Sequence, residues 1–171
     1  MSSAPISSPA VVPTAGSFRT LLVPLDGSAV APVVFRTAVQ MARVFDAQIH
    51  LLRVLTIDPV FPPAAHVTPD GLEPKLVADA QGELKRWMAS VAGVTFGPAL
   101  VVLGDPWRQI LAVARATNVD LIVIGSHRYH GVDRILGTVS SKVVNHADRD
   151  VLVVHRRTRV GGSTSGKPRT D

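Results

Sequence analysis

The chain has 171 residues, of which 46% are hydrophobic and 18% charged, and its mean hydropathy is +0.26. These values fit one globular domain with a sizeable buried core, and they argue against general disorder and against a multidomain enzyme. No run of about 18 apolar residues occurs, and the start of the chain lacks the charged and apolar regions of an export signal. We therefore expect a cytoplasmic protein without a membrane segment. The absence of cysteine excludes disulfides, thiolate metal sites and cysteine nucleophiles.

The net charge of +5 belongs mainly to the last residues. From Arg156 onward there are five cations and one anion, Asp171, so the rest of the chain is nearly neutral. A basic tail can contact nucleic acid weakly, but a solvated tail that aids solubility is the commoner case. We do not expect nucleic-acid binding.

Composition divides the chain into three parts. Residues 1–17 are rich in Ser, Pro and Ala, and residues 158–171 in Gly, Ser and basic side chains, so neither end can bury enough surface to order itself. Both ends are predicted to be flexible tails around a domain at residues 18–157.

Short apolar runs within the domain predict five strands, which are buried on both faces because their hydrophobicity is continuous. The runs are residues 20–24, 49–55, 99–103, 121–124 and 151–154. Helical patterns separate them. Alternating strands and helices favour an α/β doubly wound parallel sheet with helices on both faces.

The predicted helices follow apolar residues at steps of three and four. They start after Ser28, with Pro32 in the first turn, near Leu76, behind the turn Gly104–Pro106, and near Val139. Residues 56–74 contain five prolines and no period. This segment is predicted to be a long loop, which could serve as a lid or as an inert insertion.

Two strand ends carry candidate binding groups, because ligands of such sheets bind beyond the carboxyl ends of the strands. The first is Pro24-Leu25-Asp26-Gly27-Ser28. The Asp26 carboxylate could accept hydrogen bonds from a ribose or an adenine amine. The alternative is a simple turn in which Ser28 or Asp26 caps the following helix.

The second strand end leads into a glycine-containing segment, residues 125–141. Gly125, Gly131 and Gly137 allow close approach of the backbone to an anion, Thr138 and Ser140 offer hydroxyls, and the next helix presents free N–H groups. This pattern indicates a phosphate cradle, although glycine-rich segments are often only turns. It is neither a Walker A loop nor a GxGxxG loop.

Together these motifs resemble those of the universal stress protein family. The resemblance covers nearly all of residues 18–156 and includes Leu-Val-Pro-Leu-Asp-Gly-Ser, Leu-Leu-Arg-Val, the Gly-Asp-Pro turn, Asp120-Leu-Ile-Val-Ile-Gly-Ser-His and Leu136-Gly-Thr-Val-Ser. It implies a five-stranded parallel sheet in the order 3-2-1-4-5, of the adenine nucleotide alpha hydrolase-like type. It also implies homodimers paired through the last strand and, in one branch of the family, bound ATP, with or without magnesium.

The resemblance also implies a role for particular residues. Asp26, two residues after Pro24, would face the ribose and adenine, and Val54 would meet adenine through its backbone while its side chain packs in the core. The phosphates would be held by Gly125, Gly137, Thr138 and Val139, with Gly131 as the glycine inside the loop.

One position departs from the pattern of the ATP-binding branch. That pattern has a second glycine three positions after the first, with nine residues between it and the last glycine. This chain has Arg128 at the second position, and only eight residues separate it from Gly137. Arg128 could obstruct the site, or its guanidinium could pair with the phosphates.

Other candidates carry less weight. His127 and His130 could suggest a metal, but no third ligand is near in sequence, so a solvated or phosphate-facing role is favoured. Ser126 lacks the GxSxG elbow of hydrolases. Trp87 and Trp107 are predicted to pack helices and Tyr129 to lie at the surface. His50 and Arg53 are predicted to point to the rim or to partners.

The sequence thus predicts a dimeric stress-response and signalling module that binds ATP or another adenine nucleotide. No general base or Walker lysine is identifiable, so any ATP hydrolysis or autophosphorylation would be slow. The alternative is a member that binds no nucleotide and acts through dimerisation and protein contacts.

Overall fold

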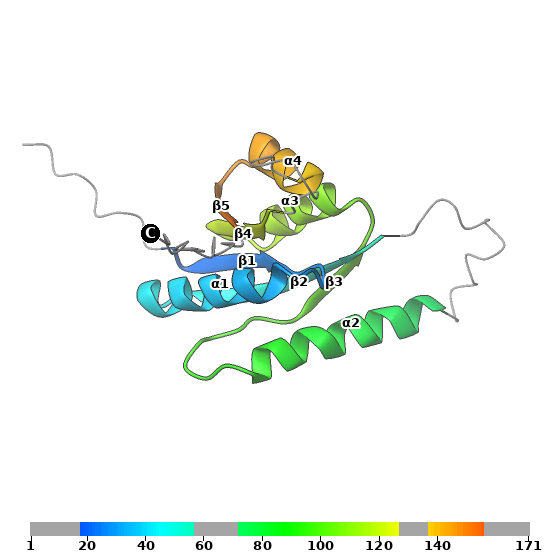
Figure 1. Cartoon of the computed structure of the whole chain (residues 1–171), viewed down its shortest axis with the longest axis horizontal. Helices are drawn as coiled ribbons and strands as arrows, with labels where there is room; N and C mark the ends of the chain where they lie inside the picture. Colours follow the sequence, from blue (N-terminus) through cyan, green and yellow to red (C-terminus); the bar gives the residue numbers. More distant parts are fainter. Residues whose placement is uncertain (1–17, 57–71, 127–136, 156–171) are drawn as a thin grey trace, which may run out of the picture.

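A computed structural model of the chain describes residues 18–56, 72–126 and 137–155 (Figure 1). Strands and helices alternate throughout. In chain order the elements are β1 (Thr20–Pro24), α1 (Ala31–Phe45), β2 (Gln48–Leu55), α2 (Leu72–Ala89), β3 (Leu100–Leu103), α3 (Pro106–Ala116), β4 (Leu121–Gly125), α4 (Thr138–His146) and β5 (Asp150–Val154). Each predicted strand agrees with an observed one to within one residue at either end.

The five strands form one parallel sheet in the order β3-β2-β1-β4-β5, as the sequence predicts. β1 lies at the centre, and its Leu21 is in register with Ile49 of β2 and with Leu121 of β4. The chain first forms β1, β2 and β3, which extend the sheet to one side of β1, and then β4 and β5, which extend it to the other side. The strand order therefore reverses between β1 and β4.

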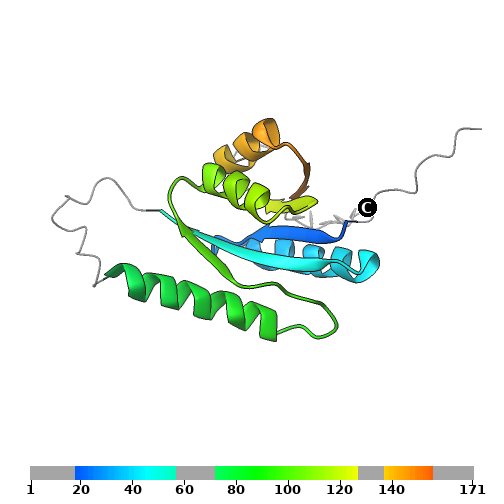
Figure 2. The same cartoon turned by 180° about the vertical axis from the view of Figure 1, so that it is seen from behind.

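Helices cover both faces of the sheet, which explains why the strands are apolar on both sides (Figures 1 and 2). One core lies beneath α1 and α2 and contains Leu21, Val23 and Leu51 of the strands. The other lies beneath α3 and α4 and contains Leu22 and Ile122. Adjacent residues of a strand thus belong to different cores.

The first two helices differ in detail from the sequence prediction. Pro32 lies in the first turn of α1 as expected, but the N-cap residue is Val30, and no side chain caps the helix. α2 already begins at Leu72, so the predicted loop at residues 56–74 ends earlier than expected. Leu76, predicted to lie on the buried stripe of this helix, is 50% exposed.

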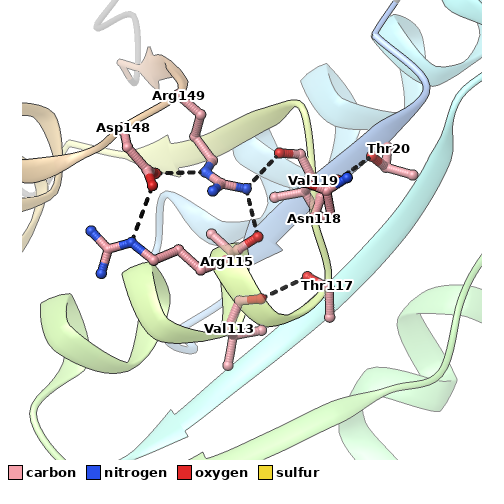
Figure 3. A network of polar contacts seen from close by, with 9 residues as sticks. Thr20, Val113, Arg115, Thr117, Asn118, Val119, Asp148 and Arg149 are labelled. Atoms are coloured by element: carbon pink, nitrogen blue, oxygen red, sulfur yellow. Dashed lines mark hydrogen bonds and ion pairs between the residues drawn. The ribbon is translucent and has the colours of Figure 1, made fainter.

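A polar network closes the edge of the sheet where the strands begin (Figure 3). Arg149, in the turn before β5, donates from Nη1 to the carbonyl of Ala114 (2.6 Å) in the last turn of α3 and to that of Val119 (2.8 Å) in the turn that follows. Its Nε donates to Asp148, whose carboxylate also accepts a hydrogen bond from Arg115. The hydrogen bonds from Arg149 and Arg115 hold the pKa of Asp148 well below its usual range.

Asp120 performs a similar role at the start of β1 on the same edge. Its Oδ2 accepts hydrogen bonds from the backbone N–H groups of Arg19 (2.7 Å) and Thr20 (2.9 Å) and from the Thr20 hydroxyl (3.0 Å). Burial alone would raise the pKa of Asp120, but these hydrogen bonds and the Arg19 charge lower it.

Among the described helices, none combines the length and the apolar character needed to cross a bilayer. The two tails, residues 1–17 and 158–171, and most of the 56–74 segment lie outside the described residues.

Candidate functional site

A cavity of about 330 Å³ opens at the edge of the sheet where the strands end, at the reversal point between β1 and β4. This is the place where ligands bind in open α/β sheets, and the volume falls within the range of small-molecule sites. Among the described residues the lining comprises Pro24, Leu25, Asp26, Ser28, Ala31, Val34, Val54, Pro106, Ile110, Ile124, Gly125, Gly137, Thr138, Val139 and Ser140.

The cavity brings together all the described residues that the sequence singled out for binding. Pro24 and Asp26 come from the end of β1, Val54 from β2, Gly125 from β4, and residues 137–139 from the start of α4. The joining of these segments is observed in the structure, whereas their contact with a nucleotide stays a prediction.

The loop between β1 and α1 is organised by its own side chains. The Asp26 carboxylate accepts a hydrogen bond from the Ser28 N–H (3.0 Å), and the Ser28 hydroxyl accepts one from the Val30 N–H (3.3 Å). Both side chains therefore stabilise the turn before α1, and the expectation that one of them caps the helix is wrong. Asp26 remains exposed at the cavity wall.

Val54 contributes backbone as well as side chain to this region. The carbonyl of Leu52 accepts a hydrogen bond from Leu25 on the β1 side of the strand. Backbone groups two residues apart in a strand point to the same side, so those of Val54 point toward β1, which ends in the sheet at Pro24. They are thus directed past the end of β1, while the side chain packs against the core under α3 and α4.

Gly125 packs closely against the start of α1. A Cβ atom at this position would lie 3.0 Å from Cγ2 of Val34 and 3.1 Å from Cγ1 of Val30. The start of α1 therefore crosses so close to the end of β4 that a side chain would press on Val30 and Val34. This contact explains the glycine independently of phosphate binding.

Ser140 holds the end of β4 against α4. Its hydroxyl donates to the carbonyl of Gly125 at 2.6 Å, and the residue is 3% exposed. In this structure the one hydroxyl proton of Ser140 is donated to Gly125, whereas Thr138 is exposed. The contact of either hydroxyl with a ligand stays a prediction.

The start of α4 is open toward the cavity. Gly137 occupies the N-cap position, and having no side chain it cannot bond the N–H groups of the first turn. Thr138, Val139 and Ser140 of that turn line the cavity. Free N–H groups and the positive end of the helix dipole favour a negatively charged ligand group here.

Charged side chains contribute little to the described lining, in which Asp26 is the one ionisable residue. Arg128, Gly131, Tyr129, His127 and His130 lie outside the described residues. Within the described part of the chain, no three His, Asp or Glu side chains gather in a manner that could hold a metal ion.

The two tryptophans and Ser126 make contacts within the fold. Trp87 packs against Phe35 with ring centroids 4.9 Å apart, and Trp107 packs on the core under α3 and α4, as predicted. The buried Ser126 lies 2.7 Å through Oγ from Nδ1 of His155, and it is not among the described lining residues. This contact joins the ends of β4 and β5.

His50 and Arg53 both contact other parts of the chain. The His50 ring packs against Gly97, its Nδ1 is buried without a hydrogen-bond partner, and burial lowers its pKa. Arg53 is 21% exposed and donates from Nη1 to the carbonyl of Leu25 (3.0 Å). Both side chains are partly exposed and make contacts within the chain, and the expectation that they point to the rim or to partners stays a prediction.

Sequence reasoning missed the contribution of α3 to the site. Pro106 and Ile110 line the cavity one turn apart. The turn Gly104–Pro106 marked the start of this helix, but nothing in the sequence showed that the first turn would lie opposite the start of α4.

The fold and site define a class: a doubly wound α/β domain with a ligand cavity at its strand reversal. Residues 17–155 match the model of the universal stress protein family. A universal stress protein from Methanocaldococcus jannaschii is 30% identical over 142 residues, which cover 81% of this chain and 83% of that protein. The chain therefore belongs to the universal stress protein family.

Solved structures share the fold. UspA from Lactobacillus plantarum superposes with a TM-score of 0.63 at 26% identity, over 80% of this chain and 97% of that one. A universal stress protein solved in complex with cAMP superposes with a TM-score of 0.56 at 24% identity, over 81% and 98% of the two chains.

Proposed function

We propose that this protein binds ATP or another adenine nucleotide in the cavity between β1 and β4. The observation that carries the proposal is the convergence of Asp26, Val54, Gly125 and the uncapped start of α4 on one cavity. These groups match the parts of a nucleotide: a carboxylate for the ribose, backbone groups for the adenine, and N–H groups for phosphates. The relative solved with cAMP supports the adenine nucleotide class.

The two ends of the ligand are assigned by the chemistry of the two walls. The start of α4 favours negative charge, so the phosphates belong near Gly137, Thr138 and Val139. The Asp26 carboxylate would repel phosphates and accepts hydrogen bonds from hydroxyls, so the ribose belongs on the β1 side. Adenine then lies toward Val54, whose backbone groups are directed past the end of β1.

The described lining favours binding over rapid turnover. Asp26 is its one ionisable side chain, and its position on the ribose side leaves the phosphates without a general base among the described residues. We therefore propose a cytoplasmic binding module of the stress response, whose hydrolysis or autophosphorylation of ATP is slow at most.

We also propose that the protein is a homodimer paired through β5. This strand is an edge of the described sheet, and Val151, Leu152 and Val153 along it are half-buried. An apolar edge strand with unpaired backbone groups is a template for pairing with a second copy.

A second candidate function is dimerisation and protein contact without any nucleotide. It is favoured by the packing of Val30 and Val34 on Gly125, which accounts for that glycine without a ligand, and by the family-pattern glycine being Arg128 here.

One experiment separates the two functions. The nucleotide content of protein purified without added ligand is measured by chromatography after denaturation, and ATP is titrated by calorimetry at physiological salt. We expect bound nucleotide or a micromolar Kd, and loss of both in Asp26→Ala and Gly137→Val. No nucleotide and no heat in the unaltered protein would reject nucleotide binding, whereas unchanged affinity in both variants would reject this site.

A further variant tests the role of Arg128. Arg128→Gly restores the glycine of the ATP-binding pattern. Tighter ATP binding than in the unaltered protein would show that the arginine obstructs the cavity, and weaker binding would show that it pairs with the phosphates.

A further inference from the structure

Arg53 lies behind the loop that carries Asp26. It is the neighbour of Val54 in β2, and because adjacent side chains of a strand point to opposite faces, Val54 faces the cavity and Arg53 faces away from it. The Arg53 guanidinium donates to the carbonyl of Leu25 at 3.0 Å. This bond joins the end of β2 to the residue before Asp26.

The guanidinium also packs directly against the backbone of the loop. Gly27 has a φ of +73°, in the left-handed region, and a Cβ atom there would lie 3.2 Å from both Nη1 and Nη2 of Arg53. The loop backbone at Gly27 therefore lies in close contact with the guanidinium, which would have to shift slightly to admit a side chain there.

One oxygen of the Asp26 carboxylate is bonded to the loop backbone. Its Oδ1 accepts a hydrogen bond from the Ser28 N–H, so a change of the backbone at Gly27 would also move this bond. Leu25, Asp26 and Ser28 all line the cavity. Arg53 therefore contacts the backbone of the loop whose residues form this part of the cavity wall.

Arg53 is itself held by an opposite charge. Its Nη2 lies 3.9 Å from Oε2 of Glu83 on α2, and the two side chains are 21% and 35% exposed. A partly buried guanidinium is tolerated where its charge and donors find partners: here the Leu25 carbonyl accepts a hydrogen bond, and the Glu83 carboxylate supplies an opposite charge without a hydrogen bond. Its planar fork keeps both contacts in one geometry.

We infer that Arg53 is a positioning residue for the ribose side of the site: it fixes the loop of residues 25–28 so that the Asp26 carboxylate is aimed at the ribose hydroxyls. The inference rests on the proposed nucleotide binding and names a determinant of its specificity. A nucleotide that lacks the ribose hydroxyls should not benefit from this arrangement.

The test compares ATP with 2′,3′-dideoxy-ATP by calorimetry on the full-length protein. The measured quantity is the ratio of the two Kd values, because a general loss of affinity or stability would not change it selectively. We expect the unaltered protein to prefer ATP by about tenfold, the scale of one charged hydrogen bond. Arg53→Met should lose most of this preference, as Asp26→Asn should, whereas Arg53→Lys, which can still donate to Leu25, should recover part of it.

Arg43→Met is the matched control. Arg43 donates from Nη2 to the carbonyl of Ala92 at 3.0 Å, so this variant removes a guanidinium–carbonyl hydrogen bond of the same length that does not involve the described cavity lining. It should keep the full preference for ATP. Circular dichroism melts establish that each variant is folded at the temperature of the titration.

The outcomes distinguish the two proposals. Binding of ATP without preference over the dideoxy analogue in the unaltered protein, or a preference that survives in Arg53→Met, would overturn the role of Arg53 alone. An unaltered protein that takes up no ATP would overturn the proposed function and this inference with it.

Discussion

Asp120 shows how one carboxylate can make folding depend on pH. Its hydrogen bonds with Arg19 and Thr20 lower its pKa in the folded protein. A group with a lowered folded-state pKa stabilises the protein above its unfolded-state pKa, and this contribution is lost as pH falls through the folded-state pKa. The relevant window therefore begins near pH 4 and extends below it.

Asp120→Asn should reduce the free energy of unfolding by about 1 kcal/mol at neutral pH, because the carboxylate acceptor is replaced by a neutral amide. It should also flatten the decline in stability below about pH 4. Urea unfolding from pH 7 to pH 3 measures both effects. Asp150→Asn, at an exposed aspartate that begins β5, is the control. Equal pH slopes for the two variants would contradict the role of Asp120.

The His50 ring leaves no room for a side chain at Gly97. A Cβ atom there would lie 2.4 Å from Cε1 and 2.5 Å from Nδ1 of His50. Gly97→Ala should therefore lower the free energy of unfolding by about 1–3 kcal/mol, the usual cost of overpacking. His50→Ala should remove most of that cost when the two changes are combined. Thermal melts of the single and double variants measure the coupling, and strictly additive losses would refute this cause.

Arg149 connects the end of α3 to the start of β5. The last carbonyls of a helix lack partners within the helix. The Ala114 carbonyl accepts a hydrogen bond from the Val119 N–H and a second one from Arg149. Arg149 also bonds the Val119 carbonyl in the turn that follows, so one side chain fixes the end of α3 against the start of β5 (Figure 3). With 15% exposure, its guanidinium is screened less than a surface charge.

Arg149→Met should lower the free energy of unfolding by about 2 kcal/mol, because two carbonyls lose a charged donor. Arg115→Met should cost less than about 1 kcal/mol, since Arg115 is 54% exposed and pairs with Asp148 at the surface. Denaturant unfolding of both variants makes the comparison. A larger loss in Arg115→Met would show that the surface ion pair, and not the carbonyl contacts, secures this joint.

At the scale of the whole molecule, β5 determines the proposed assembly. A homodimer should have a mass of roughly 36 kDa, twice the 18.1 kDa of the chain. Val151→Lys places a charge on the edge strand and should shift the protein toward monomer, as charges do on natural edge strands. Light scattering coupled to gel filtration measures the mass. Val144→Lys, on the 41% exposed position of α4, should leave the dimer intact. A monomeric unaltered protein would reject the dimer.

Much of the fold could be read from the sequence because its signals are local. Continuous apolar runs such as residues 121–124 mark strands buried on both faces, and the turn at residues 104–106 marks the start of a helix. The strand order came from the resemblance of motifs to a family, not from periodicity, and the structure confirms it. The misjudged start of α2 at Leu72 reflects helix formation within a proline-containing segment.

The candidate site, too, could be predicted from the sequence only in part. By itself the sequence determined which strand ends carry polar and glycine residues, because these follow directly on apolar runs. Only the tertiary structure decided that Ser140 bonds Gly125, that Val30 and Val34 pack on that glycine, and that Arg53 supports the Asp26 loop. These contacts join residues far apart in the chain, and their partners are set by how α1, α4 and β2 pack, which no local pattern records.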